Sequence, residues 1–373
     1  MASKRILITG GAGFIGSHLA DELLSQGHEV RALDCLSAQV HGSGCARPDY
    51  LARDVDLHLG DVRDRDAVRR ALKGVDAVFH FAAAVGVGQS MYQIEHYTSV
   101  NSLGTAVLLE ALIEHPVERL VVASSMSIYG EGLYRLPDGT ETAAAERTRA
   151  QLQAGHWEPR SAFGHALTPV PTPERKRPSL SSVYALSKYD QERLCLMTGR
   201  AYNLPTVALR LFNVYGTRQA LGNPYTGVLA IFAARLLNGN PPLIFEDGLQ
   251  QRDFVNVKDV ARACVLALQK PDAAYGAFNI ASGHAYTVRE VARRMAETLG
   301  KPQLRPEITG KYRMGDIRHC FADISHARKV LGFEPQVPFG RGLEELTEWL
   351  RGQVATDRVA QMRAELEARG LTA

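Results

Sequence analysis

Short apolar runs alternate with stretches of helical periodicity through the first part of the chain. The apolar runs are typical of strands buried in a parallel sheet and cover 4–9, 29–33, 55–59, 75–81, 120–123 and 207–212. Helical periodicity starts directly after the first run and returns at 66–72 and 105–113. Short connections of this kind imply right-handed crossovers. We therefore predict an α/β fold with a doubly wound parallel sheet, the Rossmann architecture.

The rest of the 373-residue chain is less regular. We predict that the larger domain spans 1–212 and that a helix and a strand at 254–281 return to it. Residues 213–253 and 282–350 then form a smaller C-terminal α/β domain for the substrate. The charged amphipathic stretch at 343–369 predicts a helical tail, which we assign to 351–373.

An insert at 131–180 interrupts the larger domain. It is rich in Pro, Thr, Arg and Ala, and its proline cluster excludes a long helix. We expect a surface excursion with one short helix near 143–153. A lid over the site and an insertion without function are both open interpretations.

Three glycines follow the first strand and mark the beginning of the first helix. Gly10 permits a tight turn, Gly13 lets backbone approach a pyrophosphate, and Gly16 lets the helix pack close to the sheet. Phe14 and Ile15 then lie in the first turn of the helix, where unpaired N–H groups face phosphates. A strand before the glycines and a helix after them indicate a dinucleotide site.

Asp34 ends the second predicted strand. A carboxylate at this position suits the ribose hydroxyls of an adenosine and repels a 2′-phosphate. We therefore expect NAD rather than NADP as the cofactor.

Tyr184 and Lys188 lie four residues apart, so they are neighbours on one helix face. An ammonium group beside a phenol favours the phenolate, and such a tyrosine can exchange a proton with a substrate hydroxyl near neutral pH. Ser125, at the end of a strand, can hydrogen-bond the same hydroxyl. These three residues predict hydride and proton transfer beside the dinucleotide.

Composition narrows the possible functions. The net charge of +3 is small and the basic residues are dispersed, which argues against nucleic-acid binding. We find no signal peptide and no apolar run of membrane-spanning length. Five cysteines without a CxxC pair favour reduced thiols, and the histidines form no metal-ligand cluster. We expect a cytoplasmic protein without a metal site.

These motifs resemble the extended short-chain dehydrogenase/reductase family, specifically its nucleotide-sugar epimerases and dehydratases. The resemblance covers nearly the whole chain through TGGAGFIGS, GDVRD, HFAAAVGVGQS, NSLGT, SSMSIYGE, YALSKYDQE, RLFNVYG, QRDFVNVKDVA and GDIRHCFADISHARKVLGF. It implies a Rossmann domain, bound NAD and a nucleotide-diphosphate sugar as substrate. The insert and the GKYRMGDIRHCFADIS stretch are most similar to dTDP-L-rhamnose 4-epimerases.

The resemblance also implies residue roles. Asp61 and Val62 match adenine contacts, and Ala82, Ala83 and Ser124 match the floor under the cofactor. Ser125, Tyr184 and Lys188 match the catalytic trio. On the substrate side the matching positions are Ser127, Asn213, Arg252 and Arg313, with Asp316 beside the diphosphate grip and Cys320 at the wall that limits room around the sugar.

One departure separates the subclasses. Similar 4,6-dehydratases carry Asp-Glu directly after the catalytic hydroxyl residue, whereas this chain has Met126 and Ser127, which cannot act as general acids at neutral pH. We therefore expect a nucleotide-sugar 4-epimerase. A UDP-sugar (glucose, GlcNAc or glucuronate) 4-epimerase and a decarboxylase or reductase are alternatives, and a non-catalytic NAD-sensing regulator is a remote one.

The resemblance further implies a homodimer in which two helices from each copy form a four-helix bundle. These helices are 105–113 and 184–197, with apolar Leu108, Leu109, Leu112, Leu194 and Leu196. The alternative is that these leucines face the core of the monomer.

Overall fold

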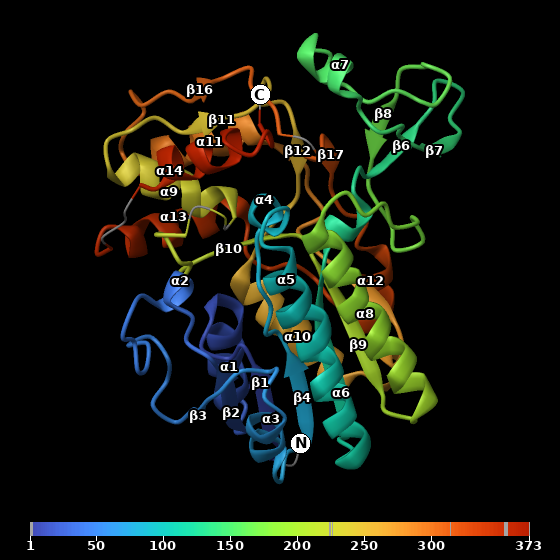
Figure 1. Cartoon of the computed structure of the whole chain (residues 1–373), viewed down its shortest axis with the longest axis vertical. Helices are drawn as coiled ribbons and strands as arrows, with labels where there is room; N and C mark the ends of the chain where they lie inside the picture. Colours follow the sequence, from blue (N-terminus) through green and yellow to red (C-terminus); the bar gives the residue numbers. More distant parts are fainter. Residues whose placement is uncertain (1–2, 224, 226, 314, 354–356, 373) are drawn as a thin grey trace.

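A parallel sheet forms the centre of the larger domain (Figure 1). The structure is a computed structural model that describes residues 3–223, 225, 227–313, 315–353 and 357–372, and within them the sheet has seven strands. Every neighbouring pair is parallel, which confirms the predicted fold class. In spatial order the strands are β14 (Ala277–Ile280), β9 (Thr206–Leu211), β5 (Arg119–Ser125), β4 (Ala77–His80), β1 (Arg5–Thr9), β2 (Glu29–Asp34) and β3 (Asp56–Leu59).

Helices cover both faces of this sheet, so its central strands are buried almost throughout and mainly apolar. On one face, α1 (Phe14–Ser25), α10 (Val257–Gln269) and α12 (Ser325–Leu331) pack against Ile6 and Ile8 of β1. On the other, α3 (Arg65–Leu72), α6 (Gly104–Glu114) and α8 (Val183–Ala201) pack against Leu7. The alternating direction of side chains along β1 thus supplies both cores.

The second core contains leucines that the sequence had suggested for a dimer bundle. Leu108, Leu109, Leu112 and Leu196 are buried in it, and Leu194 packs against it. These positions therefore face the monomer core, and the alternative interpretation is correct for them.

The smaller domain packs three helices around its own apolar core. These helices are α9 (Val228–Leu237), α11 (Val288–Thr298) and α13 (Phe339–Leu350). Three small sheets lie outside the seven-stranded one: β10 (Asn213–Tyr215) with β13 (Phe254–Asn256), β11 (Leu243–Ile244) with β16 (Glu307–Ile308), and β12 (Gln251–Arg252) between β15 (Tyr286–Thr287) and β17 (His319–Cys320). Although its sequence position suggested this domain, α12 packs with β14 and α10 of the larger one.

The insert contains more regular structure than its sequence predicts. It forms an antiparallel sheet of β6 (Leu133–Arg135) between β7 (Glu141–Ala143) and β8 (Thr168–Val170), and it stands apart from the other elements in Figure 1. The expected helix near 143–153 is confined to α7 (Arg149–Gln153). Strands of three residues are too short to produce a readable alternation, and β8 pairs with β6 across a long sequence separation.

The C-terminal stretch forms two helices rather than one. After α13, helix α14 (Val359–Glu367) buries Val359, Met362 and Leu366 against Leu243, while residues 354–356 lie outside the described part of the chain. The remaining short elements are α2 (Ala38–His41), α4 (Val87–Ser90), α5 (Ile94–Tyr97), the π-helical turn Thr98–Leu103, and the 3₁₀ turns Met126–Tyr129 and Pro271–Ala273.

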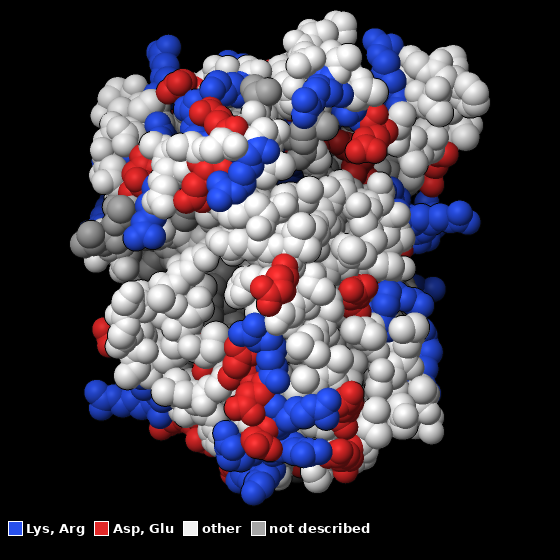
Figure 2. Space-filling model, in the orientation of Figure 1, with Lys and Arg blue, Asp and Glu red and all other residues white. Residues whose placement is uncertain are grey.

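The surface carries charges of both signs. Figure 2 shows Lys and Arg interspersed with Asp and Glu over the viewed face. Among the described helices, none is both long and apolar enough to cross a membrane. Over the same described ranges, no group of three or more His, Cys, Asp or Glu side chains is arranged to hold a metal ion.

Candidate active site at the carboxyl ends of the strands

The glycine-rich turn after β1 has the close contacts that its sequence predicts. Gly10 adopts φ +72°, and a Cβ there would lie 2.8 Å from the backbone nitrogen of Ala82. A Cβ on Gly16 would collide with the carbonyl oxygen of Gly10. Helix α1 begins at Phe14 with Gly13 as its N-cap, and no side chain caps its first turn. This turn fits a pyrophosphate, because its amides are oriented like those of an anion site.

Gly11 is a further constrained position that the sequence interpretation passed over. A Cβ on Gly11 would lie 2.6 Å from the Cβ of Ala32 on β2. The second glycine of the turn therefore lets it approach the neighbouring strand closely. The two consecutive glycines in TGGAG were the sequence feature that could have indicated this close approach.

Asp34 joins the end of β2 to the glycine turn. Its carboxylate accepts hydrogen bonds from the backbone nitrogens of Ala12 (3.0 Å) and Leu36 (2.9 Å). A carboxylate has about four acceptor positions, so two bonds to backbone leave capacity for a ribose diol. The donor set and the cradle together fit NAD.

The other predicted cofactor residues also lie along this edge. Asp61 accepts bonds from the backbone and guanidinium of Arg63, which lower the pKa of its carboxyl. Val62 is buried and packs where a Cβ on Gly104 would collide with it. Ala82 and Ala83 follow β4, and the nitrogen of Ala82 donates to Thr9 Oγ1 at 3.2 Å.

Ser124 has a different environment from the one its predicted role suggests. Its hydroxyl donates to Glu192 Oε2 at 2.6 Å, and Glu192 in turn pairs with Arg210 through two hydrogen bonds. The side chain of Ser124 thus ties β5 to α8, and its place in the floor under the cofactor stays a prediction.

Ser125 and Tyr184 face each other across the site. Ser125 ends β5, and its Oγ accepts bonds from the nitrogen (3.2 Å) and hydroxyl (2.9 Å) of Ser127. Tyr184 lies in the first turn of α8, whose N-cap is Ser182. Burial raises the pKa of the Tyr184 phenol, and its hydrogen bond with Ser125 lowers it. The ring of Tyr97 meets Tyr184 edge-on at 6.4 Å between centroids.

Lys188 follows Tyr184 by one helical turn and is buried. Its ammonium donates to Oε1 of Gln191 at 2.6 Å. Burial lowers the pKa of Lys188 to about 8, so the group stays mostly protonated at neutral pH. The spacing predicted that this charge favours the phenolate of Tyr184. In the structure the pKa of the Tyr184 phenol is raised overall by burial, and the Lys188 ammonium bonds to Gln191.

The predicted substrate residues converge at the boundary with the smaller domain. Arg252 lies opposite Cys320 in the β12–β17 register. Arg313 pairs with Asp316 at 2.9 Å and lies 4.7 Å over the Phe245 ring. Burial raises the pKa of Asp316, but nearby arginines, Arg313 and Arg252 among them, lower it overall.

Two predicted residues are engaged with the protein itself. The Asn213 amide donates to the carbonyl oxygen of Asp253 at 2.9 Å, and the Arg252 guanidinium donates to the carbonyl oxygen of Arg318 at 2.9 Å. Cys320 is 1% exposed, and burial raises the pKa of its thiol to about 12. The Cys320 thiol is therefore uncharged, as suits a residue in the predicted wall around the sugar.

The insert contributes charged residues that sequence reasoning missed. Arg147 donates to Glu246 Oε1 (2.8 Å) and to the carbonyl oxygen of Asp316 (2.7 Å). Fully buried Arg318 pairs with Glu158 (2.6 Å), Asp247 (2.6 Å) and Glu246 (3.0 Å). Weak periodicity in the insert gave no signal for Arg147 or Glu158. The insert is thus fastened to the strand that carries Cys320.

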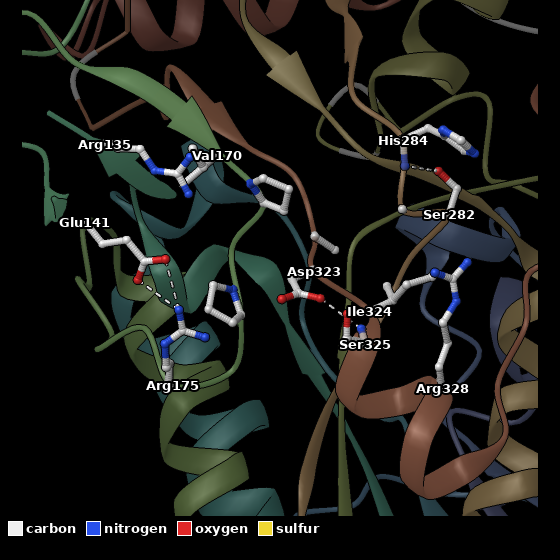
Figure 3. A pocket seen from close by; sticks show the side chains of 14 residues that line it. Arg135, Glu141, Val170, Arg175, Ser282, His284, Asp323, Ile324, Ser325 and Arg328 are labelled. Carbon is white, nitrogen blue, oxygen red and sulfur yellow. Dashed lines mark hydrogen bonds and ion pairs between the residues drawn. The ribbon is translucent and has the colours of Figure 1, made fainter. Parts of the chain in front are cut away.

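A separate cavity of about 440 Å³ lies on the other side of the insert sheet. In Figure 3, Arg135, Glu141 and Arg175 of the insert lie across from Asp323, Ser325 and Arg328. Arg175 pairs with Glu141 at 2.8 Å. None of the described residues that line this cavity belongs to the candidate site, so it does not extend the site.

Comparison with known proteins places the chain among sugar-nucleotide enzymes. Residues 6–281 match the model of the NAD dependent epimerase/dehydratase family. The chain belongs to this family. It is 36% identical to a dTDP-L-rhamnose 4-epimerase of Burkholderia thailandensis over 352 residues, which are 93% of this chain and 95% of the relative.

Two solved structures are similar over the same extent. A Thermotoga maritima UDP-glucose 4-epimerase with UDP-glucose has a TM-score of 0.76 and 32% identity, covering 93% of this chain and 98% of that one. A Thermus thermophilus UDP-glucose 4-epimerase in complex with NAD has a TM-score of 0.74 and 34% identity, covering 94% and 100%. The predicted family and its NAD dependence are thereby confirmed.

Proposed function

We propose that the protein is an NAD-dependent nucleotide-sugar 4-epimerase. The observation that carries this proposal is the contact between Ser125 and Tyr184 at the strand ends, beside a turn shaped for a dinucleotide. Met126 and Ser127 follow Ser125, and neither supplies the acid that eliminating water requires. The family match and the 4-epimerases among its relatives support the same reaction class.

The proposed roles follow from the chemistry of each side chain. Tyr184 takes the proton from the sugar 4-hydroxyl and later returns it, and Ser125 holds that hydroxyl in place. The glycine turn and Asp34 would hold NAD, which would supply the hydride acceptor and donor that inversion at C4 requires. Lys188 supplies a buried positive charge on the helix face of Tyr184 that favours the phenolate.

The substrate side suits a diphosphate. Arg252 and Arg313 can form forked, charge-assisted bonds with phosphate oxygens once they exchange their present partners. Within the class we favour dTDP-L-rhamnose, because the insert and the relative with 36% identity both support it. UDP-sugars are the next candidates. A decarboxylase would begin with the same C4 oxidation, and a reductase would transfer hydride in one direction only. An NAD-sensing regulator would not need the Tyr–Lys pair.

The test is incubation of the purified protein with a panel of nucleotide sugars and no added reductant. We expect a product of equal mass, the same mixture from either C4 epimer, and no stoichiometric consumption of NAD(H). In deuterated water the product should gain no carbon-bound deuterium. Loss of water or carbon dioxide would assign the protein to the dehydratase or decarboxylase branch, and deuterium at C3 or C5 would contradict the C4 mechanism.

We also propose a cytoplasmic homodimer. Several apolar side chains around α8 are exposed, including Leu103 (53%), Leu186 (48%) and Met197 (49%). Figure 2 shows broad uncharged areas on the face that carries α4, α5 and α8. A self-complementary patch of this kind suits a two-fold interface. Light scattering at micromolar concentration should report twice the mass of the monomer, and a monomer alone would contradict the proposal.

A further inference from the structure

A network of hydrogen bonds between buried, uncharged side chains runs from Lys188 to the end of β1. Gln191 is fully buried, accepts from Lys188 through Oε1, and donates through Nε2 to Thr105 Oγ1 at 3.0 Å. Thr105 lies 2.8 Å from Nε2 of His80, and Nδ1 of His80 lies 2.8 Å from Thr9 Oγ1. Thr9 accepts from the nitrogen of Ala82, which follows β4. Each link is a side chain in the interior.

The bond from Lys188 orients the Gln191 amide, and the His80 tautomer follows from the hydroxyl bonds of Thr105 and Thr9, while Gln191 Nε2 also lies 3.2 Å from His80 Nε2. An ammonium group only donates, so Oε1 of Gln191 faces Lys188 and Nε2 faces Thr105. Thr105 gives its single hydrogen to the carbonyl oxygen of Asn101 at 2.6 Å, so it accepts from both Gln191 and Nε2–H of His80. Nδ1 of His80 then accepts from Thr9. The network is satisfied only with His80 neutral, in agreement with burial, which lowers the pKa of His80 to about 3.

We propose that Gln191 is the positioning residue for Lys188, holding its ammonium with an oxygen that Thr105 and His80 anchor to the strands flanking the cofactor turn. This inference rests on the proposed function for the catalytic part of its consequence, but the contact itself does not depend on it. Within the described part of the chain, the Gln191 side chain hydrogen-bonds neither the phenol of Tyr184 nor the glycine turn. It acts through Lys188.

The hydrogen-bond partner of the buried Lys188 ammonium is an amide rather than a carboxylate. A carboxylate at this position would neutralise the charge of Lys188, whereas the amide orients the ammonium and leaves its charge uncompensated. The charged or titratable groups that interact with Lys188 are His80 on β4, and Glu192 and Cys195 on α8, and Tyr184 lies one helical turn before it. Glu192 is already paired with Arg210, which weakens its hold on Lys188.

The first test measures Lys188 directly in the NAD-loaded protein. The ¹³Cε signal of labelled Lys188, assigned by its absence in Lys188→Met, is titrated in wild type, Gln191→Leu and Gln191→Glu. The leucine variant removes the acceptor, so the pKa of Lys188 should fall by about one unit, and the added carboxylate should raise it by about one unit. Shifts that are absent or have the same sign in both variants would overturn the proposal.

The second test uses catalysis. In the pH profile of kcat/KM, the apparent pKa of the high-pH limb should follow the pKa of Lys188. It should fall in Gln191→Leu and rise in Gln191→Glu. A merely structural role would lower kcat without moving the limb. Thr206→Val is the matched control, because it removes another fully buried hydroxyl that bonds only locally, to the carbonyl oxygen of Leu204. The apparent pKa of the high-pH limb should be unchanged in this control.

The two tests also separate this inference from the proposed function. A wild-type protein without epimerase activity would contradict the proposed function, while the Lys188 titration would still decide the role of Gln191. Should Gln191→Leu fail to fold, the isosteric Gln191→Glu variant alone must raise the pKa of Lys188. An unchanged value in that variant contradicts the proposal.

Discussion

The two sides of the candidate site are held together by different kinds of contact. On the cofactor side, neutral groups such as Thr9, Thr105 and Gln191 connect the strand ends to α8. On the substrate side, Arg147 of the insert and Arg318 both pair with the buried carboxylate of Glu246, and Arg318 also pairs with the exposed carboxylate of Glu158. Both networks join segments more than 100 residues apart, Gln191 with His80 in the first and Glu158 with Arg318 in the second. The first uses neutral hydrogen bonds at the edge of the sheet, whereas the second uses ion pairs between the insert and the smaller domain.

The difference matches what each side must do. A neutral network leaves the Lys188 charge unpaired, because among the described residues the ammonium bonds to the Gln191 amide rather than to a carboxylate. The substrate side must bind an anionic diphosphate, so its arginines need fixed positions before the substrate binds. Ion pairs with carboxylates provide those positions. The comparison predicts that catalysis is sensitive to single atoms on the cofactor side, and that folding is sensitive to charge on the substrate side.

The largest effect is expected for Tyr184→Phe, which keeps the ring and removes the acid. Turnover should fall by at least ~10²-fold, the scale of lost general acid–base catalysis. Cofactor and substrate binding should survive, because the glycine turn and the arginines are unchanged. Tyr202→Phe at the exposed end of α8 is the matched control. Steady-state kinetics that gave near-wild-type turnover for Tyr184→Phe would refute the mechanism.

Arg318→Met tests the charged side through stability. Arg318 is fully buried, and its loss leaves Glu246 buried with fewer cationic partners. Breaking such a pair costs about 3–5 kcal/mol of unfolding free energy. Arg351→Met, which breaks an exposed pair with Glu348, should cost less than about 1 kcal/mol.

The same variant has a defined pH dependence. Burial raises the pKa of Glu246 even in the wild-type protein, and removing Arg318 raises it further. A carboxyl whose folded pKa lies above its unfolded value favours the folded state at low pH and loses that contribution as pH rises. Urea unfolding should therefore show a smaller deficit at pH 5 than at pH 7.5. A deficit that grows on acidification would contradict this account.

The cofactor side could be predicted from the sequence because its signals are local. The glycines, Asp34 and the Tyr184–Lys188 spacing each lie within one strand–turn–helix or one helical turn. The uniformly buried strands are equally readable, and their boundaries were correct to within about two residues. Gln191 escaped notice because an amide inside a helix carries no motif.

The substrate side could be predicted only where family motifs cover it. Arg252, Arg313 and Asp316 do meet, but the partners Arg147 and Glu158 come from an insert without periodicity. Their contacts depend on tertiary structure that joins distant segments. The prediction that five leucines form a dimer interface was wrong for a related reason, since helical spacing alone cannot distinguish a core face from an interface face.

Arg313→Gln sharpens the comparison at the substrate itself. Removing one guanidinium from the phosphate grip should raise KM for the nucleotide sugar about tenfold, because a charge-assisted bond is worth at least about 1.4 kcal/mol. NAD affinity and kcat should change little. Arg293→Gln, which removes an exposed arginine paired with Glu297, is the control. A loss of kcat with unchanged KM would assign Arg313 to the chemistry instead.

The smallest effect is expected for Asp34→Asn, which removes a charge from the cofactor side while keeping its shape. The remaining amide oxygen can accept from Ala12 or Leu36, though not from both as the carboxylate does. Repulsion of a 2′-phosphate by one partly solvated charge is worth about 1 kcal/mol, so the preference for NADH over NADPH should fall by about fivefold.

Fluorescence titration of cofactor-free protein with NADH and NADPH measures this preference. Asp56→Asn is the control, because Asp56 begins the neighbouring strand β3 and pairs with Arg31 at 2.8 Å near the surface. Its preference should stay at the wild-type value. If Asp34→Asn also kept the wild-type ratio, discrimination would come from the shape of the turn, and charge would play no part in cofactor choice. A fall in both affinities at a constant ratio would show the same, since the lost backbone bond would then be the whole effect.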